Sequence, residues 1–206
     1  MTFIRLLYKA WCYFIVLLYH NIGTLIFKLK LIINAVKYGS GVCCYNAIPI
    51  LQINRRSGNV EFGRNIIFNS YTAHSWNCRC KIIVKENAIL RIGDNSGMNG
   101  VMIYCSHKII IGNNVKIGGG TRISDSNHHS LDYINRRDFD QDMLHTKTGP
   151  ISIGDDVFIG ANCIINKGIT IGDRSIVAAG SVVVKSIPED EIWGGNPAKL
   201  IKKITL

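Results

Sequence analysis

The segment from residue 151 to residue 185 contains a repeat of six residues. Written from Ile153, it reads IGDDVF, IGANCI, INKGIT, IGDRSI and VAAGSV. Apolar residues recur six apart at Ile153, Ile159, Ile165, Ile171, Val177 and Val183. Four residues after each of the first five stands a small or β-branched side chain, at Val157, Cys163, Ile169, Ser175 and Ser181. Neither a helix period of 3.6 nor a strand period of 2 produces this recurrence. A hexapeptide repeat predicts a parallel β-helix, whose units bury their apolar residues only by stacking on neighbouring coils.

The repeat extends toward the N-terminus with decreasing regularity. From residue 111 it is clean, with units IGNNVK, IGGGTR and ISDSNH led by Ile111, Ile117 and Ile123. Between residues 45 and 99 only pairs keep the spacing of six, namely Phe62 and Phe68, Val84 and Leu90, and Ile92 and Met98. Terminal coils of a solenoid are usually the atypical ones. We therefore expect one β-helix over residues 45–187, in a chain whose 206 residues suit a single domain.

Two segments interrupt or follow the repeat. Residues 127–149 are polar, mixed in charge and without hexads. So long an excursion from a compact domain is usually functional. The final segment, residues 188–206, contains GGNPAKLIKKITL, which predicts a turn followed by a short basic helix or strand.

The first 44 residues differ from the rest of the chain. Residues 10–27, AWCYFIVLLYHNIGTLIF, contain no charged side chain. A transmembrane helix needs about 20 apolar residues, and His20, Asn21 and Gly23 interrupt this run. A signal peptide is disfavoured because no small-x-small cleavage site follows. The preferred interpretation is two helices, over residues 2–20 and 24–37, that pack on the β-helix or lie in a membrane interface.

The net charge of +10 is concentrated near the N-terminus, because residues 1–60 contain seven Lys or Arg and no acid. This suits an anionic membrane surface at least as well as nucleic acid, and we expect no nucleic-acid partner. The seven cysteines include a C-x-C at Cys78 and Cys80, without a second pair at a zinc-like spacing. We interpret all seven as reduced thiols in a cytoplasmic protein.

The run IGDDVFIGANCIINKGITIGDRSIVAAGSVVVKSIP, followed by GGNPAKLIKKI, resembles the hexapeptide-repeat acyltransferases. The likeness is closer to their O-acetyltransferase branch, which acts on sugars and surface polysaccharides and includes antibiotic acetyltransferases. It is clear over residues 111–204 and weaker back to residue 62. The resemblance implies a left-handed coil of three hexapeptides per turn and a homotrimer with active sites between subunits. It also implies transfer of an acetyl group from acetyl-CoA to a hydroxyl of a sugar or polysaccharide precursor.

Such a transfer needs a base with a pKa near 7 within reach of the sugar hydroxyl, and histidine suits this role. His128 and His129, in ISDSNHHSLD, occupy the matching place in the family's motif. The orders D-x-x-x-H-S and H-x-x-D favour His129 as the base, whereas a direct N-H likeness would select His128. Asp125 or Asp132 could orient the imidazole, or either could be a turn residue.

The resemblance also implies binding positions for the donor and the acceptor. Small residues along the pantetheine arm correspond to Ala161 and Ala179, and basic residues facing the phosphates correspond to Lys185, Lys199 and Lys202. Asn99, in the SGMNG turn, is a candidate for the acceptor side.

Three alternatives remain open. The first is a non-catalytic β-helix scaffold, as in carbonic-anhydrase-like relatives that lost their metal. Those relatives use three zinc-ligating histidines, and only the adjacent His128-His129 pair lies at the right place, so we expect no metal. The second is transfer of a longer acyl chain from acyl carrier protein, and the third is an antibiotic as the acceptor. We expect a cytoplasmic enzyme, peripheral at the inner face of the membrane through residues 1–37.

Overall fold

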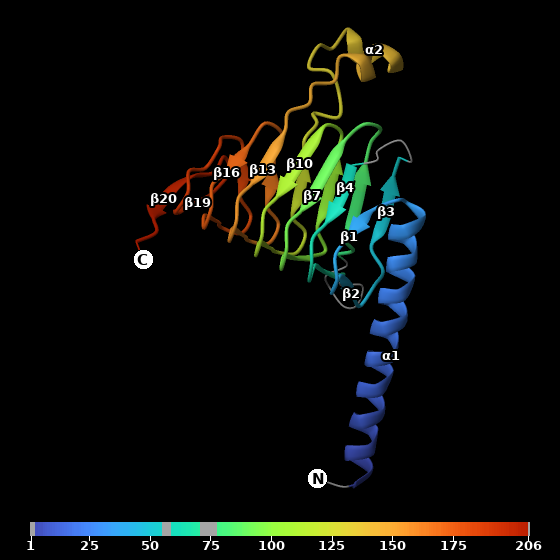
Figure 1. The fold of residues 1–206 in the computed structure, drawn as a ribbon. Coiled ribbons are helices and arrows are strands. Elements are labelled where there is room, and N and C mark those ends of the chain that lie inside the picture. Colours follow the sequence, from blue (N-terminus) through green and yellow to red (C-terminus); the bar gives the residue numbers. More distant parts are fainter. Residues whose placement is uncertain (1–2, 55–58, 71–77, 206) are drawn as a thin grey trace.

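The computed structural model describes residues 3–54, 59–70 and 78–205. Thr2, the expected start of the first helix, lies outside these ranges, as do Arg55 and Arg56 of the basic N-terminal part. A long helix stands at one end of a stack of short parallel strands, and a loop with a short helix projects from the middle of the stack (Figure 1).

The N-terminal helix, α1 (Phe3–Ile33), is continuous. The expected break at residues 21–23 is therefore wrong. An interior Gly costs a helix only about 1 kcal/mol relative to Ala, and packing near Gly23 offsets this cost. The side chains of His20 and Thr24 both hydrogen-bond the carbonyl oxygen of Cys44, at 2.9 and 3.2 Å. Phe27 is fully buried, and its ring meets that of Phe68 edge-on at 5.2 Å.

The helix and the coil share the first 44 residues. Strand β1 (Lys37–Tyr38) already pairs with β4 (Asn59–Phe62), and β2 (Cys43–Tyr45) pairs with β5 (Ile67–Asn69). The coil thus begins at Lys37 rather than at residue 45. Only the C-terminal half of α1 packs against it, while the N-terminal half extends beyond the stack (Figure 1).

The strands form three sheets, and each strand from β1 to β18 is followed along the chain by a strand of another sheet. The first sheet contains β1, β4, β7 (Ile89–Ile92), β10 (Lys108–Ile111), β13 (Ile151–Ile153) and β16 (Thr170–Ile171). The second contains β2, β5, β8 (Gly97–Asn99), β11 (Lys116–Ile117), β14 (Phe158–Ile159), β17 (Ile176–Val177), β19 (Glu191–Gly194) and β20 (Lys199–Lys203). The third contains β3 (Ile50–Ile53), β6 (Lys81–Val84), β9 (Met102–Cys105), β12 (Arg122–Ser124), β15 (Ile164–Ile165) and β18 (Val182–Val183). The chain is a parallel β-helix, as the hexads predict.

The core of the β-helix consists of the in-phase apolar positions. Every leading residue of the clean hexads is at most 2% exposed, and those of the ragged pairs at most 3%. Between them lie the small positions, of which Cys163, Ser175 and Ser181 are fully buried. Each buried Ile replaced by Ala would cost about 2–5 kcal/mol, so the repeat itself stabilises the stack.

One corner explains why the hexads carry Gly after Ile. A Cβ added to Gly112 would lie 2.7 Å from the carbonyl carbon of Gly154 in the next coil, so no side chain fits there. Two residues later Asn114 has φ of 58°, a left-handed conformation that Asn tolerates better than most residues. The close stacking of coils therefore fixes the residue type at this corner.

The C-terminal tail is a strand rather than a helix. β19 adds to the second sheet parallel to β17, and β20 returns antiparallel on β19. Among helices of the described ranges, none is both long enough and apolar enough to cross a membrane.

The excursion leaves the stack after β12 and returns at β13. It contains a 3-10 turn (Asn135–Arg137) and helix α2 (Phe139–Leu144). Asp138 caps α2 by accepting a hydrogen bond from the backbone N–H of Gln141 at 2.9 Å. An antiparallel β-bridge between Ser126 and Thr148 joins the two ends of the excursion. The excursion thereby places α2 beside the residues that follow β12.

Candidate active site

His129 forms a close pair with a carboxylate of the excursion. Its Nδ1 lies 2.6 Å from Oδ2 of Asp142, which stands on α2. The other oxygen of Asp142 accepts the backbone N–H of Ser130 at 2.7 Å. The side chain of Asp142 is 11% exposed and that of His129 is 70% exposed. A buried carboxylate thus holds one edge of an imidazole whose remainder faces solvent.

The surroundings of Asp142 determine the tautomer of His129. Hydrogen bonds from His129 and from the Ser130 backbone lower the pKa of the Asp142 carboxyl, so it is ionised at neutral pH. An ionised carboxylate only accepts hydrogen bonds, and the imidazole must therefore donate from Nδ1. The lone pair then resides on Nε2, the nitrogen that can take a proton from a substrate hydroxyl. This is the arrangement of an oriented general base.

The loop that carries His129 is fixed from several sides. The guanidinium of Arg136 donates to the carbonyl oxygen of Ser130 at 2.7 Å. Asp132 is a turn residue, because its Oδ1 accepts the N–H of Ile134 at 2.9 Å while its own N–H bonds the Ser130 hydroxyl. Asp132 therefore does not orient the imidazole, although its spacing from His129 allowed that interpretation.

Asp125, the other candidate orienter, has a different role. It is fully buried, and its carboxylate accepts the backbone N–H groups of Ser106, His107 and Lys108 at 2.7–2.8 Å. These bonds tie the end of β12 to the corner between β9 and β10. Asp125 therefore has a structural role at the end of β12, and Asp142 is the carboxylate that contacts the predicted base.

His128 points to a different environment. Its Nε2 lies 2.9 Å from the hydroxyl of Ser124, and its ring centroid is 4.4 Å from that of Tyr104. Burial, with a smaller contribution from neighbouring His129, lowers the pKa of His128, so the ring is neutral at pH 7. Its φ of 65° is left-handed, a conformation that costs a residue with a side chain about 1–3 kcal/mol.

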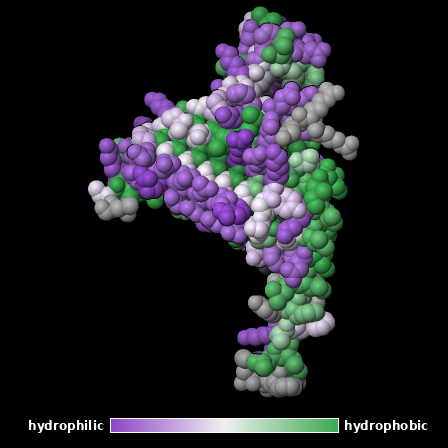
Figure 2. Space-filling model, in the orientation of Figure 1, coloured by the Kyte–Doolittle hydropathy of each residue, from purple (hydrophilic) through white to green (hydrophobic). Residues whose placement is uncertain are grey.

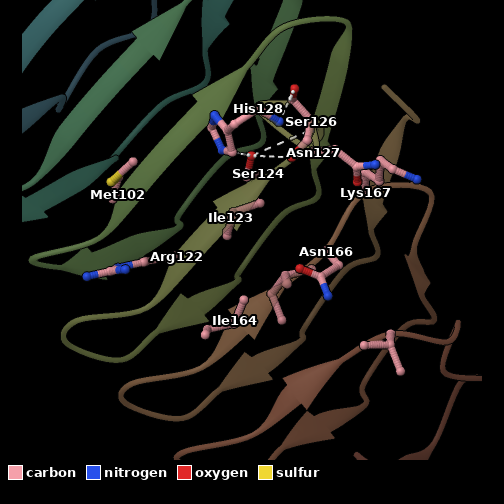
Figure 3. A pocket seen from close by; sticks show the side chains of 12 residues that line it. Met102, Arg122, Ile123, Ser124, Ser126, Asn127, His128, Ile164, Asn166 and Lys167 are labelled. Carbon is pink, nitrogen blue, oxygen red and sulfur yellow. Dashed lines mark hydrogen bonds between the residues drawn. The ribbon is translucent and has the colours of Figure 1, made fainter. Parts of the chain in front are cut away.

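Two hollows meet at His128. The first, of about 520 Å³, lies along β12 and β15 and is lined by Met102, Arg122, Ile123, Ser124, Ser126, Asn127, His128, Ile164, Ile165, Asn166, Lys167 and Val184. Figure 3 shows His128 with Ser124 and Ser126 at its upper edge, Lys167 beside Asn127, and Asn166 below them. The second, of about 370 Å³, includes Lys85, Tyr104 and Met143 and shares only Ser126 and His128 with the first.

The predicted donor-binding alanines lie on adjacent coils. Ala161 follows β14 and Ala179 follows β17, in the same corner of the stack. The N–H of Gly180 donates to the carbonyl oxygen of Ala161 at 2.8 Å, and a Cβ on Gly160 would meet Ala179 at 2.5 Å. The corner is therefore a strip of close-packed backbone with little side chain.

The predicted basic positions lie toward the C-terminal end of the stack. Lys185 is exposed just after β18, and Lys199 and Lys202 are exposed on β20. Asn99, at the end of β8, lines a further hollow with Ile117 and Phe158. The single chain thus places Asn99 in a different hollow from the two that His128 lines.

Sequence reasoning missed Asp142 and Tyr104. Asp142 is 13 residues from His129, beyond any local motif, and only the fold of the excursion brings the two together. Tyr104 lies on β9, two residues after Met102, and this strand contains no motif of the resembled family. Within the described ranges, no three His, Cys, Asp or Glu side chains gather closely enough to hold a metal ion.

The chain is similar to known acetyltransferases. A family model described as the hexapeptide repeat of succinyl-transferase matches residues 150–185. The galactoside O-acetyltransferase of Escherichia coli K12 is 34% identical over 119 residues, which are 56% of this chain and 54% of that protein. The chain thus spans about half the length of this relative.

Two further similarities extend the comparison. A protein of E. coli K12 named as a lipopolysaccharide biosynthesis O-acetyl transferase, WbbJ, is 31% identical over 153 residues, 72% of this chain and 74% of that protein. The crystal structure of a hexapeptide-repeat acetyltransferase from Vibrio cholerae, complexed with acetyl coenzyme A, is 42% identical, with a TM-score of 0.51. It covers 56% of this chain and 61% of that one. On the repeat, the fold and these similarities, the chain belongs to the hexapeptide-repeat acetyltransferase family and forms its left-handed parallel β-helix.

Proposed function

We propose that this protein is an O-acetyltransferase that moves an acetyl group from acetyl-CoA to a hydroxyl of a sugar or surface-polysaccharide precursor. The observation that carries the proposal is the 2.6 Å contact between His129 and Asp142, which leaves Nε2 of an exposed imidazole available as a base. Histidine is the side chain whose ordinary pKa suits proton transfer near neutrality.

The chemistry follows from this geometry. Nε2 of His129 removes the proton of the acceptor hydroxyl, and the oxygen of that hydroxyl attacks the carbonyl carbon of the thioester. When the carbon–sulfur bond breaks, the same proton passes from the imidazolium to the departing thiolate. The products are an acetyl ester and free coenzyme A, and His129 returns to its starting state. The Asp142 carboxylate stabilises the positive imidazolium that exists between the two proton transfers.

Support for the donor comes from the corner strip at Ala161 and Ala179. Small residues there let a ligand approach backbone groups, and the similar V. cholerae enzyme was solved with acetyl coenzyme A. Lys185, Lys199 and Lys202 are exposed cations that suit the phosphates of the nucleotide end, each as a point charge.

Support for a glycan acceptor comes from the relatives, of which one is named for a galactoside and another for lipopolysaccharide biosynthesis. The hollow beside Tyr104 adds hydroxyl and charged side chains around one aromatic ring, which suits a polyhydroxylated ligand. Asn99 belongs to another face and would join the acceptor site only across a subunit boundary.

We also propose a homotrimer. The outer faces of β14, β15 and the segment after β18 expose Phe158, Ile164 and Val184 by 49, 40 and 45%. Apolar side chains on two faces of a stack are suited to contacts with neighbouring subunits. We further propose that the protein works in the cytoplasm, at the inner face of the membrane. The seven cysteines, all of them free thiols, support the reducing compartment.

A second candidate for the base is His128, because it lines both hollows. Its Nε2 already shares a hydrogen bond with the Ser124 hydroxyl. Within the described residues, no carboxylate forms a hydrogen bond with the His128 ring. We therefore assign His128 to substrate contact and His129 to proton transfer.

The proposal is tested by incubating the full chain with acetyl-CoA and a panel of sugars, lipid-linked glycans and chloramphenicol-like drugs. We expect a mass increase of one acetyl group on a sugar hydroxyl, together with stoichiometric release of free coenzyme A. Binding of coenzyme A is measured separately by calorimetry. Failure to bind coenzyme A would contradict the enzyme assignment and favour the scaffold, whereas acetylation of a drug alone would contradict the glycan acceptor.

A further inference from the structure

Helix α1 has a second apolar face, which no other residue within the described ranges covers. Eight residues three or four apart form an outward stripe, each between 46 and 62% exposed: Leu7, Trp11, Phe14, Leu18, Ile22, Leu25, Leu29 and Ile32. Their spacing places them on one side of an α-helix. Phe27 and Leu31, which are fully buried against the coil, lie about half a turn away from the stripe. The helix therefore packs by one side and exposes apolar side chains on the other.

The outward stripe is a large apolar surface to be exposed to water. Figure 2 shows hydrophobic side chains along the length of α1, in contrast to the hydrophilic surface of the adjoining coil. A helix of 31 residues is about 46 Å long. Contiguous apolar surfaces of this extent on soluble proteins mark contacts with a partner or a membrane.

The charges beside the stripe indicate the partner. Arg5, Lys9, Lys28 and Lys30 are the only charged residues of α1, and the first acid in the sequence is Glu61. None of these cations belongs to the stripe. An apolar face with Trp and Leu, flanked by Lys and Arg, is the composition of helices that lie in an anionic bilayer surface.

A second copy of the chain is a poorer partner for the stripe. Two α1 helices packed stripe to stripe would bury the apolar side chains, but neither helix supplies an acid, so all eight cations of the pair would lack a counter-charge. A second copy therefore explains the apolar face of α1 but not its basic residues. An anionic lipid surface supplies both the apolar layer and the counter-charge.

We propose that α1 lies flat in the surface of an anionic lipid bilayer, with the outward stripe among the acyl chains and its cations at the headgroups. The docked residues Phe27 and Leu31 connect this helix rigidly to the first coil. The N-terminal end of the β-helix then faces the membrane, and the excursion with His129 is held at a fixed distance from it. This inference is independent of the acetyl transfer proposed above.

The test is flotation of the full chain with two kinds of vesicle. One kind contains phosphatidylcholine alone, and in the other about a third of the lipid is anionic phosphatidylglycerol. The variant Trp11→Glu/Leu18→Glu changes two stripe residues. The matched control, Phe139→Glu/Leu144→Glu, changes an aromatic and a leucine on α2 that are 78 and 74% exposed. All four sites are exposed, and circular dichroism checks that each variant is folded.

We expect the wild-type chain and the α2 control to float with the phosphatidylglycerol vesicles. The stripe variant should partition about a hundredfold less, since it removes two apolar side chains from the lipid. Arg5→Gln/Lys9→Gln should weaken binding to the anionic vesicles only. The inference is overturned if the wild-type chain does not float, or if the stripe variant floats equally well. It is also overturned if the stripe variant dissociates an oligomer in light scattering, because a second copy would then cover the stripe.

Discussion

The two adjacent histidines differ in what holds them. His129 donates to the carboxylate of Asp142, while His128 packs on Tyr104 and bonds Ser124. His128 has a left-handed backbone with φ of 65°, and its ring contacts Ser124 and Tyr104, so only His129 uses the Asp142 carboxylate. At the residue scale, the difference between a base and a binding residue therefore depends on one side chain of the excursion.

We predict that Asp142→Asn lowers kcat by about 10²–10⁴-fold, the range for losing effective general-base catalysis. The amide can donate to Nδ1, which favours the wrong tautomer of His129 and leaves the imidazolium without a counter-charge. The affinity for acetyl-CoA should change little. Steady-state kinetics with Asp140→Asn as the control measures this, because Asp140 is an exposed acid of the same helix. Equal rates for the two variants would contradict the role of Asp142.

We also predict that Asp142 stabilises the folded chain in a pH-dependent way. Its pKa is lowered in the folded state by His129 and the Ser130 N–H. The stabilisation is therefore present above the ordinary carboxyl pKa of about 3.9, and is lost as the pH falls through the lower folded value. Urea unfolding at pH 6 should show Asp142→Asn less stable than wild type, and the difference should shrink toward pH 3. A difference that grows on acidification would contradict this sign.

The sequence predicts the histidines of the site but not the partner of His129. The pair lies inside a motif, so a local pattern identifies it. Asp142 lies 13 residues further on, and the contact exists only because the excursion brings α2 beside His129. The nearer acids, Asp125 and Asp132, satisfied the expected spacings and instead bond backbone N–H groups.

At the scale of elements, α1 shows where local propensity misleads. His20, Asn21 and Gly23 suggested a break, yet the helix continues because His20 and Thr24 bond the Cys44 carbonyl and Phe27 fills the first coil. No sequence pattern reports such contacts. The hexads, by contrast, predicted which residues of the strands are buried, because each six-residue unit can bury its apolar side chain in only one way.

We predict that Phe27→Ala costs about 3–5 kcal/mol of local stability, as for other fully buried Phe residues. The docked half of α1 should then open from the first coil. Cys44 reports the opening, because burial beneath α1 raises the pKa of its thiol to about 11 and protects it. Alkylation followed by mass spectrometry should label Cys44 faster in Phe27→Ala than in wild type. Leu25→Ala, at a position 60% exposed, is the control and should leave the rate unchanged. Equal labelling in all three proteins would contradict the docking of α1.

At the scale of the whole molecule, the site elements are distributed along the stack. The histidines follow β12, the alanine corner lies at β14 and β17, and the lysines lie near the C-terminal hairpin. Asn99 faces another hollow altogether. Such a distribution is suited to sites completed by a neighbouring subunit, which neither a repeat nor a single chain can reveal.

We therefore predict a homotrimer in solution. Multi-angle light scattering should give about three times the chain mass of 22.9 kDa. Phe158→Lys/Ile164→Lys should dissociate it, because charges would replace two exposed apolar side chains of the contact faces. The dissociated chain should keep its fold and lose acetyl transfer. A wild-type monomer with full activity would contradict the prediction.

The initial rate of acetyl transfer from radiolabelled acetyl-CoA, compared between His129→Ala and His128→Ala, tests the central claim most directly. His129→Ala should lower kcat by about 10²–10⁴-fold with nearly unchanged affinity for acetyl-CoA. His128→Ala should lower kcat much less and raise KM for the acceptor. An active His129→Ala beside an inactive His128→Ala would reverse the assignment of the base, and full activity in both variants would contradict the mechanism.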